Sequence, residues 1–187
     1  VLSTLGGKSY GAGVVTVSNA IVISGTTAQL TAALVTSASK VIAATALITG
    51  TGTDMTVAEL NALDDTTSGI ITATLVTAAT ADYSSLTDDN GNNVLTITIN
   101  DAASTSITAA ALSTIGGKTA GVVTVTNAIV VTGTTAQLTA ALVTANTLVV
   151  AGTATGTISD ADDVSIAATA LSAIGGKTSG AITVTNA

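Results

Sequence analysis

The sequence has 187 residues, of which 47% are hydrophobic and 8% charged; two are aromatic, and Pro, Cys, His, Trp and Phe are absent. This apolar content is enough for a buried core, and the lack of Cys excludes disulfides, thiolate metal sites and thiol catalysis. The net charge of −7 argues against binding to nucleic acid or anionic lipid, because both need basic side chains to neutralise phosphate.

Short runs in which apolar residues alternate with Thr predict β-strands with one buried and one solvated face. They fall at residues 14–18, 40–48, 70–75, 94–99, 122–126, 147–152 and 181–185, mostly 25–28 residues apart from centre to centre. Several of these runs end in Asn, as at Asn100 and Asn127, where the amide can bond backbone groups as the chain leaves a sheet. In "TNAIVVTG" the apolar run resumes after Asn127, so a second strand is expected in some repeats.

Segments with helical apolar spacing separate the strands. They cover residues 26–36, 56–65, 80–88, 108–117, 134–144 and 167–176. Thr27, Thr56 and Thr135 are predicted N-caps, and Glu59 completes a capping box with Thr56. Helices of two or three turns are marginal alone, so each is expected to lie on a sheet.

Long phrases repeat. Residues 14–36 and 122–144 agree at 20 of 23 positions, and residues 112–128 and 171–187 at 13 of 17. The sequence therefore predicts an α/β repeat solenoid: a parallel sheet with one strand, sometimes two, and one short helix per ~27-residue coil. Residues 1–187 are expected to be a single segment of about seven coils, a window on a longer array. No apolar run approaches the roughly 20 residues of a membrane span.

The phrase "GGKT" suggests a phosphate-binding loop, which ends in Gly-Lys-Thr before a helix. Here it follows a predicted helix and precedes a strand, the reverse order, so the phosphate-loop interpretation is rejected. We expect instead that Gly116 or Gly117 adopts the left-handed conformation that ends many helices.

The acidic stretch "TDDNGNN" offers oxygen ligands at Asp88, Asp89, Asn90 and Asn92, around Gly91. Calcium prefers such ligands on a flexible loop, so calcium is a possible cofactor, although the EF-hand spacing is absent. The alternative is that Asp in a tight turn bonds its own backbone and hydrates the surface. The same structural interpretation is preferred for Asp64 and Asp65 and for the acidic residues at 159–163. No other cofactor is expected.

Regular Thr pairs on a flat sheet could order water, as in ice-binding repeat proteins. Thr72 and Thr74 form such a pair, as do residues 96 and 98, 124 and 126, and 183 and 185, but Thr also suits any exposed strand face. Catalysis finds no support, because without His, Cys or Arg no local cluster resembles a nucleophile with its base. The protein is therefore not expected to be an enzyme.

Residues 57–75 and 112–142, with "LNALDDTTSG" and strands that alternate with Thr, resemble the Thr- and Ala-rich repeat regions of very large surface or secreted proteins of bacteria, particularly marine cyanobacteria. The resemblance implies an extracellular or cell-surface structural role, in a surface layer, adhesin or filament. The expected function is a rod built by stacked coils, with copies of itself or adjacent repeats end to end as partners. The alternative is a binding module with an ice-binding or calcium-stabilised adhesin face.

Overall fold

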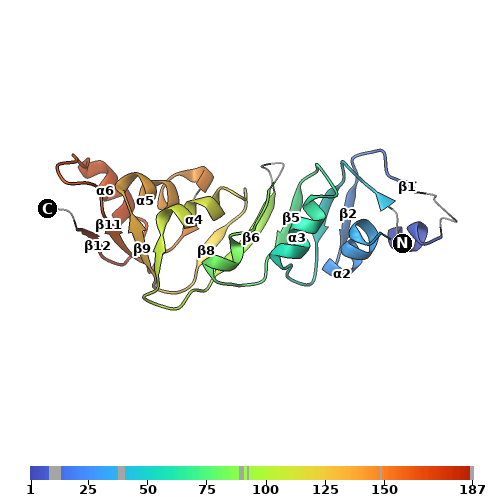
Figure 1. Ribbon diagram of the computed structural model, residues 1–187, viewed down its shortest axis with the longest axis horizontal. Coiled ribbons are helices and arrows are strands. Elements are labelled where there is room, and N and C mark those ends of the chain that lie inside the picture. Colours follow the sequence, from blue (N-terminus) through green and yellow to red (C-terminus); the bar gives the residue numbers. More distant parts are fainter. Residues whose placement is uncertain (9–13, 38–40, 89–90, 92, 148, 186–187) are drawn as a thin grey trace. The chain divides into compact units, whose positions relative to one another are not determined.

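A computed structural model describes residues 1–8, 14–37, 41–88, 91, 93–147 and 149–185. It is a mixed α/β fold with three parallel sheets of two, six and four strands (Figure 1). The predicted solenoid, with a parallel sheet of one or sometimes two strands and one short helix per coil, is therefore wrong. The second strands that were expected in some repeats do form, but the strands are divided among three sheets.

The chain divides into two compact units, Val1–Val76 with Ser85–Thr96, and Thr77–Ser84 with Ile97–Ala187. The first unit contains α1 (Leu2–Gly6), β1 (Val15–Thr16), β2 (Val22–Gly25), α2 (Thr27–Leu30), the π-helix η1 (Thr31–Val35), β3 (Val41–Ile42), β4 (Leu47–Gly50), α3 (Val57–Asp64) and β5 (Ile71–Thr74). It also holds the first half of β6 (Val94–Ile99). β1 pairs with β3, while β2, β4, β5 and β6 follow one another in a second sheet, all in parallel.

The second unit starts with the 3-10 helix η2 (Thr80–Tyr83) and the second half of β6. It continues with β7 (Ser106–Thr108), α4 (Ala109–Gly116), β8 (Val123–Val125), β9 (Val130–Gly133), α5 (Thr135–Leu142), the 3-10 helix η3 (Ala145–Thr147), β10 (Val149–Val150), β11 (Thr155–Ile158), α6 (Ala168–Gly175) and β12 (Ile182–Val184). β8 lies between β6 and β10, and the four-stranded sheet has the order β12-β11-β9-β7. These pairs are parallel too.

The core consists of thin aliphatic side chains between strands and helices. In β6, Leu95, Ile97 and Ile99 are fully buried while Thr96 is exposed, which is the alternation expected of a sheet with one wet face. In the second unit α4 packs against α5, and α5 against α6 (Figure 1). α4 also lies against β7 and β9, and its Leu112 side chain is fully buried.

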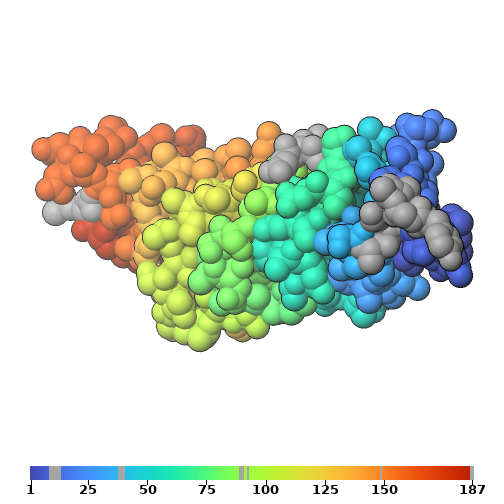
Figure 2. Space-filling model, turned by 45° about the vertical axis from the view of Figure 1, so that its right-hand side comes forward, coloured from blue at the N-terminus to red at the C-terminus, as the bar shows by residue number. Residues whose placement is uncertain are grey.

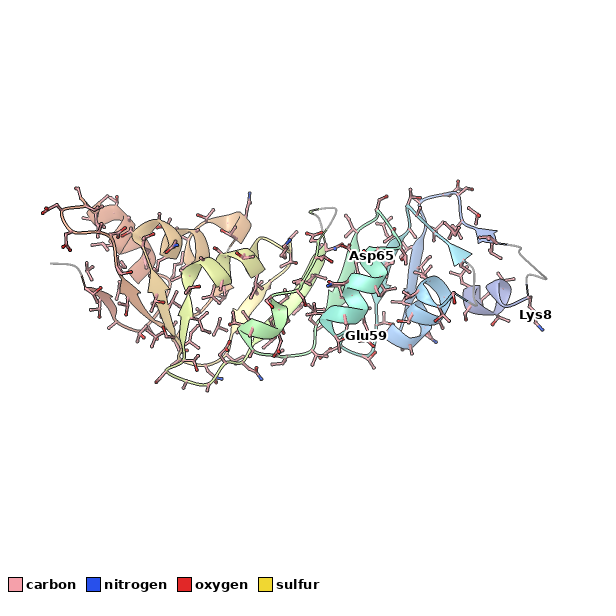
Figure 3. The ribbon with its side chains drawn as sticks, viewed as in Figure 1. Lys8, Glu59 and Asp65 are labelled. Atoms are coloured by element: carbon pink, nitrogen blue, oxygen red, sulfur yellow. The ribbon has the colours of Figure 1, made fainter. Side chains whose placement is uncertain are left out.

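The predicted capping box of α3 is confirmed. The backbone N–H of Thr56 donates to Glu59 Oε2 at 2.9 Å, and Thr56 Oγ1 accepts from the Glu59 N–H. Glu59 and Asp65 lie at opposite ends of this helix (Figure 3). The predicted caps of the two "TTAQL" helices are off by one residue, because the N-caps are Thr26 and Thr134. There a Gln three residues on replaces Glu in the box.

The expected left-handed glycine after α4 is wrong. Gly117 has φ −71° and ψ −8°, in the right-handed region, and Gly116 is the last residue of the helix. The structure gives Gly116 another role: a Cβ there would lie 2.2 Å from the carbonyl oxygen of Thr147 in η3. The absence of a side chain therefore lets the backbone of η3 approach α4.

A Thr-x-Gly arrangement, which the sequence did not reveal, joins neighbouring layers. The Thr67 hydroxyl donates to the carbonyl of Ala46 at 2.6 Å and accepts from the Gly69 N–H at 2.9 Å. A Cβ on Gly69 would lie 2.1 Å from that same carbonyl oxygen. Thr178 and Gly180 repeat the arrangement 24 residues after their own partner carbonyl. The motif thus holds the turn before a strand against the backbone of a segment 21 to 24 residues earlier in the sequence.

Candidate functional site

The predicted calcium loop lies largely outside the described residues, which exclude Asp89, Asn90 and Asn92. Asp88 is described, and its Oδ1 atom is buried without a hydrogen-bond partner among the described residues. A buried carboxylate oxygen of this kind fits a cation ligand, since burial without a partner is costly. Across the described ranges, no three His, Cys, Asp or Glu side chains gather where they could hold a metal. Calcium at this loop stays a prediction.

Asp64 does not hydrate the surface, contrary to the sequence interpretation. It ends α3 with 3% of its surface exposed, and its Oδ1 accepts from Asn93 Nδ2 at 2.9 Å. Asn93 is fully buried, and its Oδ1 accepts from the backbone N–H of Ile71 at 2.8 Å. This network of hydrogen bonds joins α3, β5 and the residue before β6, so its role is to hold these elements together.

Two other acidic side chains each cap the start of a helix that precedes them in the sequence by 21 to 25 residues. Asp160 Oδ2 accepts from the backbone N–H of Thr135 at 3.0 Å, at the first residue of α5. Asp101 Oδ2 does the same for Thr80 at 2.8 Å, at the start of η2. The predicted bond of such Asp residues to their own turn is therefore wrong at Asp160. A carboxylate at a helix N-terminus satisfies free N–H groups.

The predicted Thr pairs do lie on the wet side of strands. Thr72, Thr74 and Thr96 are exposed, and Thr74 lies directly opposite Thr96 in the register of β5 and β6. A row that was not predicted crosses the four-stranded sheet at Thr108, Thr132, Thr157 and Thr183. Its middle members are half-buried, so the row is only partly open to solvent. Ice binding stays a prediction.

The first unit ends in an uncovered strand edge. β2 pairs with β4 on one side, and no other described strand pairs with it. Val22 is 66% exposed and Ile21 37%. A hollow of about 530 Å³ lies along this strand and is lined by residues of α1, β2, α2 and η1, including Leu2, Ile23 and Leu30. The edge therefore lies beside a recess that is lined by both apolar and polar side chains, among them Ser3 and Gln29.

The second unit has a matching feature at β12, which pairs with β11 and is the outermost strand of its sheet. Val184 is 42% exposed. The neighbouring helix α6 buries only Ile174, whereas α4, with nearly the same sequence, buries four residues. A Cβ on Gly175 would meet nothing within 4 Å. In Figure 2 these last elements carry the orange and red surface, next to the yellow residues of the same unit.

The two edges were not found as sites from the sequence. The repeated phrases could have located them. Two segments of nearly the same sequence, such as α4 and α6, bury different numbers of residues when their neighbouring elements differ. Within the described part of the chain, no helix has both the length and the apolarity needed to cross a membrane. Comparison of the chain with protein-family models, with curated proteins and with solved structures finds no match.

Proposed function

We propose that the protein is a structural repeat protein of the cell surface or extracellular space that associates with copies of itself, or with adjacent repeats, through the edges of its parallel sheets. The observation that carries this proposal is that β2 and β12 each have one edge that no other described strand pairs with, and that apolar side chains are exposed beside these edges. An exposed strand edge is a template for pairing with another chain, and natural proteins usually protect it with charge, Pro or a covering element. Neither strand contains a charged residue or Pro.

The composition supports a mechanical role over a catalytic one. The chain contains no His, Cys or Arg, and its four basic residues are all Lys. It therefore lacks most of the side chains that act as catalytic bases and nucleophiles. Its acidic residues at 64, 101 and 160 are used in hydrogen bonds that hold layers together. The Thr-rich wet face and the lack of Cys suit an oxidising medium outside the cell. The negative charge disfavours nucleic acid as a partner.

Assembly is tested on the purified 187-residue chain by mass photometry and negative-stain electron microscopy over a range of concentrations. We expect particles that lengthen as concentration rises, because unlike edges that meet head to tail form open chains or rings. A single species of monomeric mass at every concentration would contradict the proposal. Guanidinium-unfolded protein, diluted just before measurement, provides the control for unspecific aggregation.

A second candidate is a binding module whose surface loop is stabilised by calcium, favoured by the buried, unpartnered Oδ1 of Asp88. If calcium binds there, millimolar calcium should raise the melting temperature by about 5 °C over EDTA. Asp88→Asn should lose most of that increase, and Asp65→Asn, at an exposed residue that follows α3, should keep it. Equal melting temperatures in calcium and EDTA would remove this candidate.

A further inference from the structure

We infer that a groove in the second unit, between α5 and residues 159–167, binds a small organic cation: an ammonium group that carries an aliphatic chain. The groove has a volume of about 490 Å³, within the range of small-molecule sites in proteins. The inference goes beyond the proposed function, because the groove lies within one unit of one chain and needs no second copy.

Part of the groove is formed by a connection that is longer than its counterpart in the preceding repeat. Residues 159–167 separate β11 from α6, whereas the single residue Thr134 separates β9 from α5. Residues 164–167 of the long connection line the groove, and Ala136 and Ala140 of α5 line it too. In repeat proteins, insertions into single repeats often form the binding face. The long connection therefore marks this surface as a place for a ligand.

The side chains that line the groove are mostly small and aliphatic. Val164 is 52% exposed, and Ala136 and Ala167 are also exposed, so apolar surface faces solvent here. The two aromatic residues of the sequence, at 10 and 83, lie outside the groove, so a planar aromatic ligand finds no ring on which to stack. An aliphatic chain gains free energy when it leaves water for such a surface. The groove therefore favours an aliphatic ligand.

Asp160 contributes a carboxylate to the groove. Its Oδ2 atom accepts from the backbone N–H and the hydroxyl of Thr135, and among the described residues none donates to its Oδ1 atom. Thr139 and Ser165, which also line the groove, carry hydroxyl oxygens that can accept. An ammonium group has three N–H donors, and its bond to a carboxylate is charge-assisted. These acceptors therefore suit the ammonium end of the ligand.

The charges around the groove select a cation over an anion. Between Lys118 and Lys177 the sequence contains no basic residue, and its only acidic residues there are Asp160, Asp162 and Asp163. All three acidic residues belong to the connection that borders the groove. Charge of one sign beside an apolar wall raises the local concentration of ligands of the opposite sign. A carboxylate next to aliphatic walls thus matches an ammonium group with an aliphatic chain.

Saturation-transfer difference NMR on the 187-residue protein tests the inference, with n-hexylammonium chloride as the probe. We expect saturable binding with a Kd on the order of 1 mM, because so small a ligand has little surface to bury. n-Hexanoate has a chain of similar length and the opposite charge, and should bind roughly 10-fold more weakly. n-Butylammonium should bind about 5-fold more weakly, because it buries two fewer methylene groups.

A charge variant locates the ammonium group. Asp160→Asn removes the charge but keeps an acceptor oxygen for Thr135, and it should raise the Kd of n-hexylammonium roughly 10-fold. Asp101→Asn is the matched control, because Asp101 accepts the same two kinds of hydrogen bond from Thr80 and does not line the groove. The Kd in this control should equal that of the natural chain.

A steric variant locates the aliphatic chain. Ala136→Leu fills the groove from α5 at an exposed position and should raise the Kd of n-hexylammonium about 5-fold. Residues 26–36 and 134–144 have identical sequences, so Ala28→Leu makes the same change at the exposed equivalent position in α2, outside the groove. It should leave the Kd unchanged. Circular dichroism checks that each variant is folded.

The same Kd for the natural chain, Asp160→Asn and Ala136→Leu would overturn the site, because the cation would then bind the acidic surface at large. Equal binding of n-hexanoate, or no saturation transfer at about 10 mM n-hexylammonium, would overturn it too. The measurement observes the ligand and works with single and assembled chains alike. A failure of this site therefore leaves the proposed association through strand edges untouched, and the reverse also holds.

Discussion

Gly116→Ala is expected to destabilise the protein by roughly 3 kcal/mol, because the added methyl group would collide with backbone. The ideal Cβ position lies 2.2 Å from the Thr147 carbonyl oxygen and 2.6 Å from its carbon. Neither atom belongs to a flexible side chain, so η3 has to move away from α4. Urea unfolding followed by circular dichroism at 222 nm measures the change in midpoint.

Gly175→Ala is the matched control, since Gly175 occupies the same place in the repeated phrase and in α6. A Cβ there meets nothing within 4 Å, and Ala is favoured over Gly in a helix by up to about 1 kcal/mol. The control variant should therefore be as stable as the natural chain or more stable. Similar losses in both variants would show that the glycines act through helix ends and not through the approach of η3.

Asn93→Leu is expected to cost about 3 kcal/mol of unfolding free energy, because it removes two buried hydrogen bonds at once. The Ile71 N–H loses its acceptor, and the buried Asp64 carboxylate loses the amide at 2.9 Å. A carboxylate that is left with fewer donors in the interior is more costly than a neutral group. Urea unfolding measures this loss directly.

A double-mutant cycle with Asp64→Leu isolates the pair. The double variant should lose less free energy than the sum of the two single variants, because the Asp64 carboxylate and the Asn93 amide then no longer leave each other unpaired. Asp65→Leu replaces the exposed neighbour and should change the stability little. Additive losses in the cycle would contradict the structural role of the Asp64–Asn93 bond.

Local elements were predictable where the pattern was strong. Each of the six predicted helical segments contains a helix, although in residues 80–88 only a 3-10 helix over Thr80–Tyr83 forms. Most Thr-alternating runs become strands, but the predicted strand at residues 40–48 divides into β3 and β4, which belong to different sheets. β11 was missed because Gly156 interrupts its alternation; the structure shows that a Cβ there would lie 2.6 Å from Ile182 Cδ1, so the neighbouring strand fills the space. β7 was missed because it has three residues and its Thr108 also caps α4.

The number of sheets could not be read from the period. Asn127 ends a strand and its amide donates to the Asp101 carbonyl at 2.8 Å, as the sequence suggested for such residues. β9, which begins three residues after Asn127, joins a different sheet because the chain turns there. The partner of the buried Asp64 is 29 residues away, and the helix start that Asp160 caps is 25 residues away. No window of local sequence contains these partners.

The distant helix caps have a consequence for how the protein is made. The first turn of α5 receives its carboxylate from Asp160, 25 residues later, and η2 receives its own from Asp101, 21 residues later. A ribosome adds about 5–20 residues per second, so each of these helices waits on the order of seconds for completion after its own residues emerge. Order therefore spreads from the N-terminus toward the C-terminus during synthesis, one layer behind the growing end.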